Sequence, residues 1–357
     1  MDIYVLDKNF DVVRVIDEYI SVIWTTRYYT YGDFELYLGA NSEILNDLKF
    51  GYYLVREQDI VSANEYHNVM IILNREMVTD ADAGDTMIFT GQCLKSILRR
   101  RVIKQTVFTA TNTLRDDLWW LIMNNFTTPT DSDRTLTIKL GTDRITNTYN
   151  IDCQMTGKTV SEAFFDLCQS YGYGYDMYIK DGDFYMYLYE GTDRSHDQNV
   201  NPYVTFSPEF DNLISCDYKE MREDYANFAY VAGEGEGVAR TIATVGTTKG
   251  LDRIEIWVDA RNASSNNGSI SESDYIKQLK QDGRDALAEH KATASFEGEL
   301  NNAINYELGV DYFLGDIVQI ENTYGVSAHA RIVEIIENDD DTGNKIIPTF
   351  SEMEVQS

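Results

Sequence analysis

The stretch TVSEAFFDLCQSYGYGYDMYIKDGDFYMYLYEG, residues 159–191, predicts a helix followed by a β-hairpin. Thr159 with Glu162 three residues later forms the capping pair that opens a helix, and Gly172 is the residue type that ends one. Asp181-Gly182 then separates two tyrosine-rich alternating runs, which is the strongest short signal of a hairpin in this chain. The stretch therefore indicates an α+β unit.

Upstream of it, TNTLRDDLWWLIMNNF at residues 111–126 predicts a second helix. Its apolar residues recur at helical spacing, and Thr113 with Asp116 forms another capping pair. Helical spacing also occurs in GQCLKSILRRRVI, residues 91–103, which ends in a basic cluster. A helix end that favours cations explains this cluster more simply than phosphate binding does. Residues 94–204 are thus expected to form an inserted α+β domain.

Short β-runs flank this domain on both sides. In residues 1–93 turn residues separate them, which is typical of a meandering antiparallel sheet that curls into a barrel or sandwich. In DFELYLG, residues 33–39, every second residue is apolar, so one face is expected in the core and the other in water. The β pattern returns after Tyr203, with one helix expected near 274–291. The expected fold class is mainly β with an α+β insertion.

The glycine-rich stretch YVAGEGEGVARTIATV, residues 230–245, raises the question of a phosphate-binding loop. Such a loop needs a helix immediately after it, so that backbone N–H groups and the helix dipole face the anion. From Val238 the chain instead alternates β-branched and small residues, and Glu234 and Glu236 would repel a phosphate. We interpret the stretch as a flexible connection between two strands.

The composition indicates a folded, strongly acidic protein with more than one domain. The chain has 357 residues, more than a single core usually supports, and 43% of them are hydrophobic. Its net charge of −29 argues against a surface that seeks nucleic acid or anionic membranes, although DNA can pass through an acidic duct without adhering. No apolar run is long enough for a spanning helix, and the opening MDIYVLDKNF lacks the features of an export signal.

A search for catalytic and metal-binding motifs finds none. The four histidines lie in unrelated segments, no G-x-S-x-G elbow occurs, and MTGKTV at residues 155–160 has Asp152 where a phosphate loop needs its first glycine. We therefore expect no catalytic residue, no cofactor and no metal. An acid pair for glycan hydrolysis stays open, because 59 acidic residues supply many pairs. Free, mostly buried thiols are expected for the widely spaced Cys93, Cys153, Cys168 and Cys216.

The chain resembles the tail hub proteins of bacteriophages, the amino-terminal structural part of tail-associated proteins at the tail tip. The likeness runs in order over nearly the whole chain and rests on a set of strand patterns rather than on a chemical signature. The segments that carry it are YGDFELYL at 31–38, FTGQCLKSILRRRVI at 89–103, the stretch 159–191 quoted above, FSPEFDNLISCDYKEMREDYANFAYVAGEGEG at 206–237, and YFLGDIVQIENTYGVSAHARIVEIIE at 312–337.

This resemblance implies a trimer in which each subunit contributes two small tube-type β-barrels, so that three chains form a pseudo-sixfold ring that continues the tail tube. The first barrel would combine residues 1–93 with 205–240, and the second would lie within 241–357. The α+β domain of 94–204 would then be an insertion on the outside of the ring. The residues implied as structural family motifs are Gly32, Asp33, Phe34, Gly91, Leu98, Arg101, Asn227, Gly233, Gly315, Asp316 and Val318.

The function implied by the resemblance is that of a non-enzymatic hub at the tip of a phage tail or tail-like particle, assembled in the bacterial cytoplasm. Its expected partners are a distal tail protein ring, the tape-measure protein and tail fibre or tip proteins, while phage DNA passes through without specific binding. No membrane insertion by this chain is expected. Two alternatives stay open: a cell-wall glycan hydrolase with an acid pair, and a carbohydrate-binding adhesin that uses surface tyrosines.

Overall fold

The computed structural model describes residues 1–80, 84–104, 106–108, 112–151, 153–215, 217–261, 263, 271–297, 300, 305–351 and 353–354. The chain forms two compact units. Unit 1 comprises Met1–Cys216 and Glu297–Ser351, and unit 2 comprises Asp217–Phe296 and Glu352–Ser357. The expected fold class, mainly β with an α+β insertion, is confirmed.

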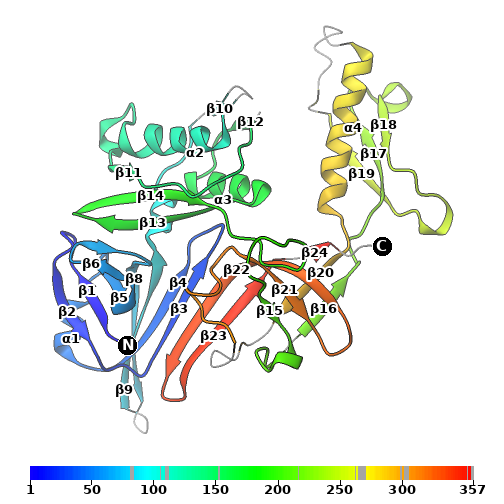
Figure 1. Cartoon of the computed structure of the whole chain (residues 1–357). Helices are drawn as coiled ribbons and strands as arrows, with labels where there is room; N and C mark the ends of the chain where they lie inside the picture. Colours follow the sequence, from blue (N-terminus) through cyan, green and yellow to red (C-terminus); the bar gives the residue numbers. More distant parts are fainter. Residues whose placement is uncertain are drawn as a thin grey trace. The chain divides into compact units, whose positions relative to one another are not determined.

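An antiparallel sheet forms the amino-terminal part of unit 1, with its strands in the order β3-β4-β9-β8-β5-β1-β2 (Figure 1). Phe34, Leu36 and Leu38 of β4 are buried, as the alternation in the sequence predicts. They pack with Trp24 and Phe89 in one apolar core. The elements are β1 Ile3–Leu6, β2 Val12–Ile16, β3 Ser21–Arg27, β4 Asp33–Gly39, α1 Ser42–Asp47, β5 Tyr53–Arg56, β8 Met70–Asp80 and β9 Gly84–Cys93.

The inserted α+β part contains the predicted helix and hairpin. Thr159 and Glu162 form the capping box of α3, and Gly172 ends this helix in the left-handed conformation. Asp181 and Gly182 both have positive φ, as a tight turn between β13 and β14 requires. Helices α2 and α3 lie on one side of this hairpin (Figure 1). The elements are β10 Thr106–Phe108, α2 Leu114–Ile122, β11 Ile138–Leu140, β12 Cys153–Met155, α3 Val160–Tyr171, β13 Gly174–Lys180 and β14 Asp183–Tyr189, with β6 Ile60–Ser62 and β7 Glu65–Tyr66 in the sheet of β13.

Two details of this part refine the predicted helices. Residues Leu94–Arg100 form a 3-10 helix, η2, whose leucines and isoleucine are buried while Arg99 and Arg100 of its last turn are exposed. Thr113 caps α2, as predicted, by accepting a hydrogen bond from the backbone N–H of Asp116. The helix then widens into a π-helical turn, η3, at Met123–Thr127.

Strands from the carboxy-terminal part of unit 1 continue its main sheet. β22 pairs with β3, from Glu334 opposite Arg27 to Asp340 opposite Ser21, and pairs with β23 on its other side. The expected hairpin turn connects β22 to β23, with Gly343 at a φ of +114°. Segments about 300 positions apart in the sequence therefore share one sheet. The elements are β15 Thr205–Phe206, β21 Ile317–Glu321, β22 Ser327–Asp340 and β23 Gly343–Phe350.

Unit 2 is built around a three-stranded sheet in the order β18-β17-β19, with α4 packed along it. α4 spans Glu272–Glu289, which confirms the helix expected near 274–291, and Ser271 caps it. Tyr275 and Leu279 of α4 pack on Ala229, Val231 and Ala243 of the sheet. The other elements are β16 Asp217–Met221, β17 Phe228–Ala232, β18 Ile242–Val245, β19 Glu255–Asp259, β20 Thr293–Glu297 and β24 Met353–Glu354.

The compact units have bounds that differ from those expected for the two barrels. The expected boundary between 240 and 241 lies in the connection from β17 to β18, and both strands belong to unit 2. Since β17 pairs with β18 on one side and with β19 on the other, a cut at this point would divide one sheet. Residues 205–216 belong to unit 1 together with 297–351. The assignment of residues to two tube-type barrels stays a prediction.

Candidate functional site

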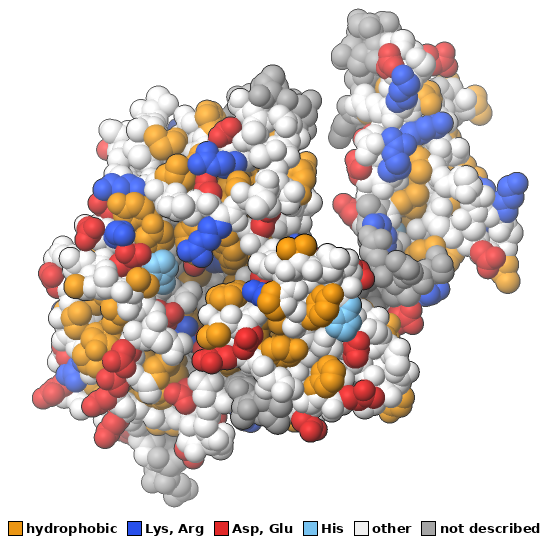
Figure 2. Space-filling model, in the orientation of Figure 1, with side chains coloured by type: hydrophobic (Ala, Val, Ile, Leu, Met, Phe, Trp, Pro, Cys, Tyr) orange, Lys and Arg blue, Asp and Glu red, His pale blue; other side chains and the backbone are white. Residues whose placement is uncertain are grey.

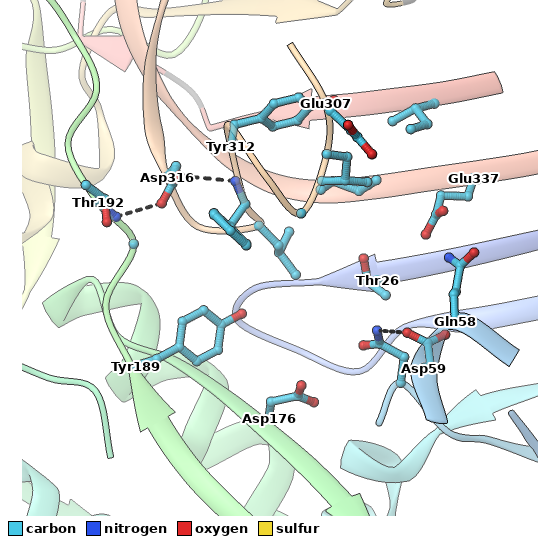
Figure 3. A pocket seen from close by; sticks show the side chains of 18 of the residues that line it. Thr26, Gln58, Asp59, Asp176, Tyr189, Thr192, Glu307, Tyr312, Asp316 and Glu337 are labelled. Carbon is cyan, nitrogen blue, oxygen red and sulfur yellow. Dashed lines mark hydrogen bonds between the residues drawn. The ribbon is translucent and has the colours of Figure 1, made fainter. Parts of the chain in front are cut away.

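A cavity of about 810 Å³ lies within unit 1, where three parts of the chain meet. Its walls come from the amino-terminal β-region, from β13 and the end of β14 with the residues after it, and from the segment 306–316 with strands β22 and β23 (Figure 3). Carboxylates and tyrosines are prominent in its lining. They are Asp59, Asp176, Glu190, Glu307, Asp316, Glu337, Tyr187, Tyr189, Tyr306 and Tyr312.

Arg56 is a buried cation on one wall of the cavity, with 3% of its surface exposed. Its Nε lies 2.6 Å from Oδ2 of Asp59, and its Nη1 lies 2.7 Å from Oε1 of Glu337. Asn68 donates a further hydrogen bond of 2.6 Å to Asp59. Burial opposes the charge of Arg56, but the two carboxylates outweigh it and raise the pKa of the guanidinium. The cluster is a buried ion network in which one arginine is shared by two carboxylates, and its Arg56–Glu337 pair links β5 to β22.

Asp316 forms a second polar node on the opposite wall (Figure 3). It is 2% exposed. Its Oδ1 accepts a hydrogen bond of 2.7 Å from the backbone N–H of Thr192, and its Oδ2 accepts bonds from Arg194 Nε at 2.7 Å and from the N–H of Phe313 at 3.1 Å. One carboxylate thereby ties the segment that leaves the inserted part to the turn that precedes β21.

Two further ionisable groups lie here: Asp176 lines the cavity, and Lys95 lies beside Asp176. Burial raises the pKa of the Asp176 carboxyl and lowers the pKa of the Lys95 ammonium, while the attraction between them opposes both shifts. Lys95 donates to the carbonyl of Arg27, and its Nζ lies 4.9 Å from the ring centroid of Tyr175. Asp176 accepts a 2.8 Å bond from the N–H of Met177. Burial of Asp176 therefore favours the protonated form of its carboxyl.

These ion pairs and hydrogen bonds are more typical of a structural contact between the parts of unit 1 than of a catalytic site. Glycan hydrolysis needs a protonated acid and a second carboxylate that is available to water or substrate. Burial shifts the pKa of Asp176 in the direction of the first condition, but Asp59, Asp316 and Glu337 are bound to arginines, as structural ion pairs are. Within the described ranges no group of three or more His, Cys, Asp or Glu side chains is placed to hold a metal ion.

Tyr28 also connects distant parts of unit 1, and its side chain is fully buried. Its hydroxyl donates to the carbonyl of Gly172 at 2.9 Å and accepts a bond from the N–H of Gly191 at 3.1 Å. A Cβ added at either Gly174 or Gly315 would lie 2.2 Å from a carbon of its ring. The inserted part and the carboxy-terminal part thus both pack against the side chain of Tyr28, which directly follows β3. Sequence reasoning missed Tyr28, because nothing local distinguishes it from the other 24 tyrosines.

Four of the residues implied as family motifs come together in the amino-terminal sheet. Phe34 lies opposite Gly91 in the β4–β9 register, and a Cβ at Gly91 would lie 1.8 Å from the carbonyl oxygen of Ile71. Gly32 accepts a bond of 2.9 Å from the N–H of Cys93. Asp33 forms an ion pair with Arg27. The group therefore surrounds one closely packed corner of the sheet.

The other motif residues lie in three separate places. Gly315 packs against Tyr28, Asp316 lines the cavity, and Val318 follows them as a buried residue of β21. In the inserted part, Leu98 is buried and Arg101 donates two bonds, of 3.1 and 2.9 Å, to the carbonyl of Arg134. The remaining two, Asn227 and Gly233, belong to unit 2. A role of the whole set as family motifs stays a prediction.

The glycine-rich stretch connects β17 to β18, as the sequence predicts. A Cβ at Gly233 would lie 2.3 Å from the hydroxyl oxygen of Tyr275, which also accepts a bond of 2.7 Å from the N–H of Glu234. Gly235 has a φ of +100°. Only a short 3-10 turn, Gly237–Ala239, precedes β18. The stretch is thus shaped by close packing under α4 and by turn geometry.

The thiols of Cys93 and Cys168 are free and buried, as expected. Burial raises the pKa of both, to about 12 for Cys168. Cys216, Asp152 and the side chain of Cys153 lie outside the described residues. Among the helices that the structure describes, none combines the length and the apolar character needed to cross a membrane.

Comparison with known proteins relates this fold to phage tails. The family described as Siphovirus ReqiPepy6 Gp37-like protein matches residues 2–350. The structure is similar to a tail protein from Neisseria meningitidis MC58 (TM-score 0.58, 14% identity, covering 98% of this chain and 96% of that one). It is also similar to the 43 kDa tail protein of prophage MuSo2 from Shewanella oneidensis (0.59, 10%, 98% and 98%) and to prophage tail protein gp18 from Listeria monocytogenes EGD-e (0.53, 11%, 98% and 94%). A search of curated proteins gives no match.

Proposed function

We propose that this chain, which belongs to the Siphovirus ReqiPepy6 Gp37-like protein family, forms a trimeric ring at the tip of a phage tail and acts there as a structural hub. The chain is a phage tail structural protein. The family match over residues 2–350, together with a fold shared over 98% of the chain, supports the proposed ring and hub role.

The sheet of unit 1 supports a ring. β3 and β22 join an amino-terminal and a carboxy-terminal β-region edge to edge within one chain. Two such regions per chain would give six around a threefold axis, with comparable joints between chains. β2 ends the sheet as an edge strand, and its Val12, Val13 and Val15 are 50, 42 and 40% exposed. An apolar edge of this kind is normally covered by another strand or chain.

The proposed partners follow from the position of such a ring. One side would meet the distal tail protein ring, the channel would admit the tape-measure protein and then DNA, and the other side would hold fibre or tip proteins. The net charge of −29 per chain suits a channel through which DNA slides. Asp and Glu side chains gather around α1 and β2 on the face of unit 1 that Figure 2 shows.

The test is the mass of the purified chain by light scattering, combined with its shape in negative stain. We expect a trimer with a central hole, or a monomer that trimerises when its tail partners are added. A stable dimer contradicts the proposal. A compact monomer that releases fragments from cell-wall glycan contradicts it as well, because that result favours the hydrolase.

A further inference from the structure

The sheet of unit 2 is covered on one face and open on the other. Ala229, Val231, Ala243, Val245, Ile256 and Val258 contribute to the core formed with α4. Because side chains alternate along a strand, the residues between them point to the opposite face. In the part of the chain that the structure describes, that face is not covered by another element of unit 2. We call it the open face of unit 2.

Aromatic and aliphatic side chains occupy the open face. Tyr230 of β17 lies directly opposite Trp257 of β19, and Phe228 packs edge-to-face on Tyr230 with 5.2 Å between ring centroids. Trp257 is 58% exposed, and Ile242 of β18 is 47% exposed. Contiguous exposure of such residues marks a binding surface.

Two arginines brace these rings. Arg253 lies 3.3 Å from the ring centroid of Phe228 and donates a 2.9 Å bond to the hydroxyl of Tyr230. Arg240 lies 5.7 Å from the centroid of Trp257 and donates a 2.6 Å bond to Asp259. Trp, Tyr and Arg held in fixed positions are the residue types that dominate protein–protein contacts.

The charge around the open face differs from that of the chain as a whole. Residues 238–261 contain four cations against three carboxylates, a net charge of +1, whereas the whole chain carries −29. The cations are Arg240, Lys249, Arg253 and Arg261, and the carboxylates are Asp252, Glu255 and Asp259. Arg240 and Arg261 pair with Asp259, and Arg253 pairs with Glu255, so the charges of this segment nearly cancel. Two copies of this chain repel each other unless they meet through a surface of low negative charge, since like charges that face each other across an interface cost several kcal/mol.

We propose that the open face of unit 2 docks on a second copy of the chain. The aromatic side chains supply the buried contact area, and the near-neutral charge of residues 238–261 lets two strongly acidic copies meet there without strong repulsion. The inference rests on the proposed trimer and adds to it a contact made by unit 2, outside the edge-to-edge joints of the unit 1 sheet.

The experiment compares the wild type with Trp257→Ala and Ile242→Asp by sedimentation velocity over a range of concentrations. Both side chains lie on the face away from α4, so circular dichroism should show both variants folded. Each should weaken self-association about tenfold or more. Trp120→Ala, which removes a tryptophan of unit 1 that is 44% exposed, is the matched control and should leave association unchanged.

Hydroxyl-radical footprinting of Trp257 supplies a second readout. Oxidation of Trp257 should fall when the chain assembles and be unimpeded in the dilute monomer. Assembly that Trp257→Ala and Ile242→Asp leave intact overturns the inference and leaves the proposed ring standing. Protection of Trp257 already in the monomer, or only after another tail protein is added, also overturns it. A chain that stays monomeric both alone and with its tail partners contradicts the proposed function as well.

Discussion

Arg56 and Glu337 form a buried ion pair across 281 positions of sequence, with 2.7 Å between Nη1 and Oε1. Arg56 ends β5 and Glu337 lies in β22, so the pair joins the amino-terminal β-region to the carboxy-terminal one. The same guanidinium holds Asp59 and lies 5.0 Å from the ring of Trp24. The two β-regions are therefore fixed to each other by charge as well as by the β3–β22 ladder.

Replacing Arg56 with Met should destabilise unit 1 strongly. The substitution leaves Asp59 and Glu337 buried without their cation, and breaking a buried pair in this way costs about 3–5 kcal/mol. The measurement is urea unfolding followed by circular dichroism. Arg14→Met is the matched control: its pair with Asp47 is partly exposed, at 26% and 36%, and its loss should cost about 1 kcal/mol or less. An equal loss of unfolding free energy in both variants would show that the buried network stabilises unit 1 no more than a partly exposed ion pair does.

Gly91→Ala should destabilise the amino-terminal sheet. The new Cβ would lie 1.8 Å from the carbonyl oxygen of Ile71 and 2.8 Å from the ring of Phe34, so strands must move apart, at a cost of about 1–3 kcal/mol or more. Gly39→Ala in the neighbouring strand β4 is the control, since a Cβ there meets nothing within 4 Å. Thermal unfolding of the two variants should give a lower midpoint only for Gly91→Ala. Similar midpoints would contradict close packing at this corner.

Local signals in the sequence predicted the helices and hairpins well. The capping residues Thr113 and Thr159 and the turn at Asp181-Gly182 act over a few positions, so their effect is visible in the sequence. The alternation that places Phe34 in the core is equally local. These features depend on backbone geometry that is set within one element.

The contacts between segments that are distant in the sequence could not be predicted in the same way. Arg56 meets Glu337, and Tyr28 meets Gly315, only because distant strands pair, and no spacing in the sequence records that pairing. For the same reason the boundary expected at 240 lies inside the sheet of unit 2, whose parallel β17–β19 pair is invisible to local patterns. The cavity and the open face of unit 2 both arise from such long-range pairing.

The pKa of Asp259 should depend on Arg261. Hydrogen bonds from Arg261 and Arg240 lower this pKa to about 2. Because the folded value lies below the unfolded value of about 3.9, the contribution of Asp259 to stability is present above about pH 4 and is lost as the pH falls through about 2. Arg261→Ala should raise the pKa, as measured by carbon-13 NMR titration of the carboxyl group. Arg284→Ala, on α4, should leave it unchanged. A pKa that stays near 2 in Arg261→Ala would contradict this assignment.

The isolated chain should not hydrolyse peptidoglycan. The carboxylates Asp59, Glu337 and Asp316 are occupied by arginines, so Asp176 lacks an available partner among them. Purified cell walls incubated with the protein should release no more reducing sugar than a buffer control. Release above that control which Asp176→Asn abolishes would reveal an active site in the cavity.

The chain should not bind duplex DNA tightly, and an assembled ring should present an acidic surface to its axis. At −29 per chain a trimer carries −87, and repulsion between charges crowded within about 8–10 Å of one another is only partly screened at ordinary salt. Acids that face a wide, hydrated channel avoid this crowding and keep DNA from adhering. Arg99 and Arg100 are exposed and keep their charge, but these few cations are small against a net charge of −29 per chain. A gel-shift assay at about 0.15 M salt should show free DNA at every protein concentration. Retardation that is tight, decreases with salt and disappears in an Arg99→Glu, Arg101→Glu variant would mean that the channel is lined by cations instead.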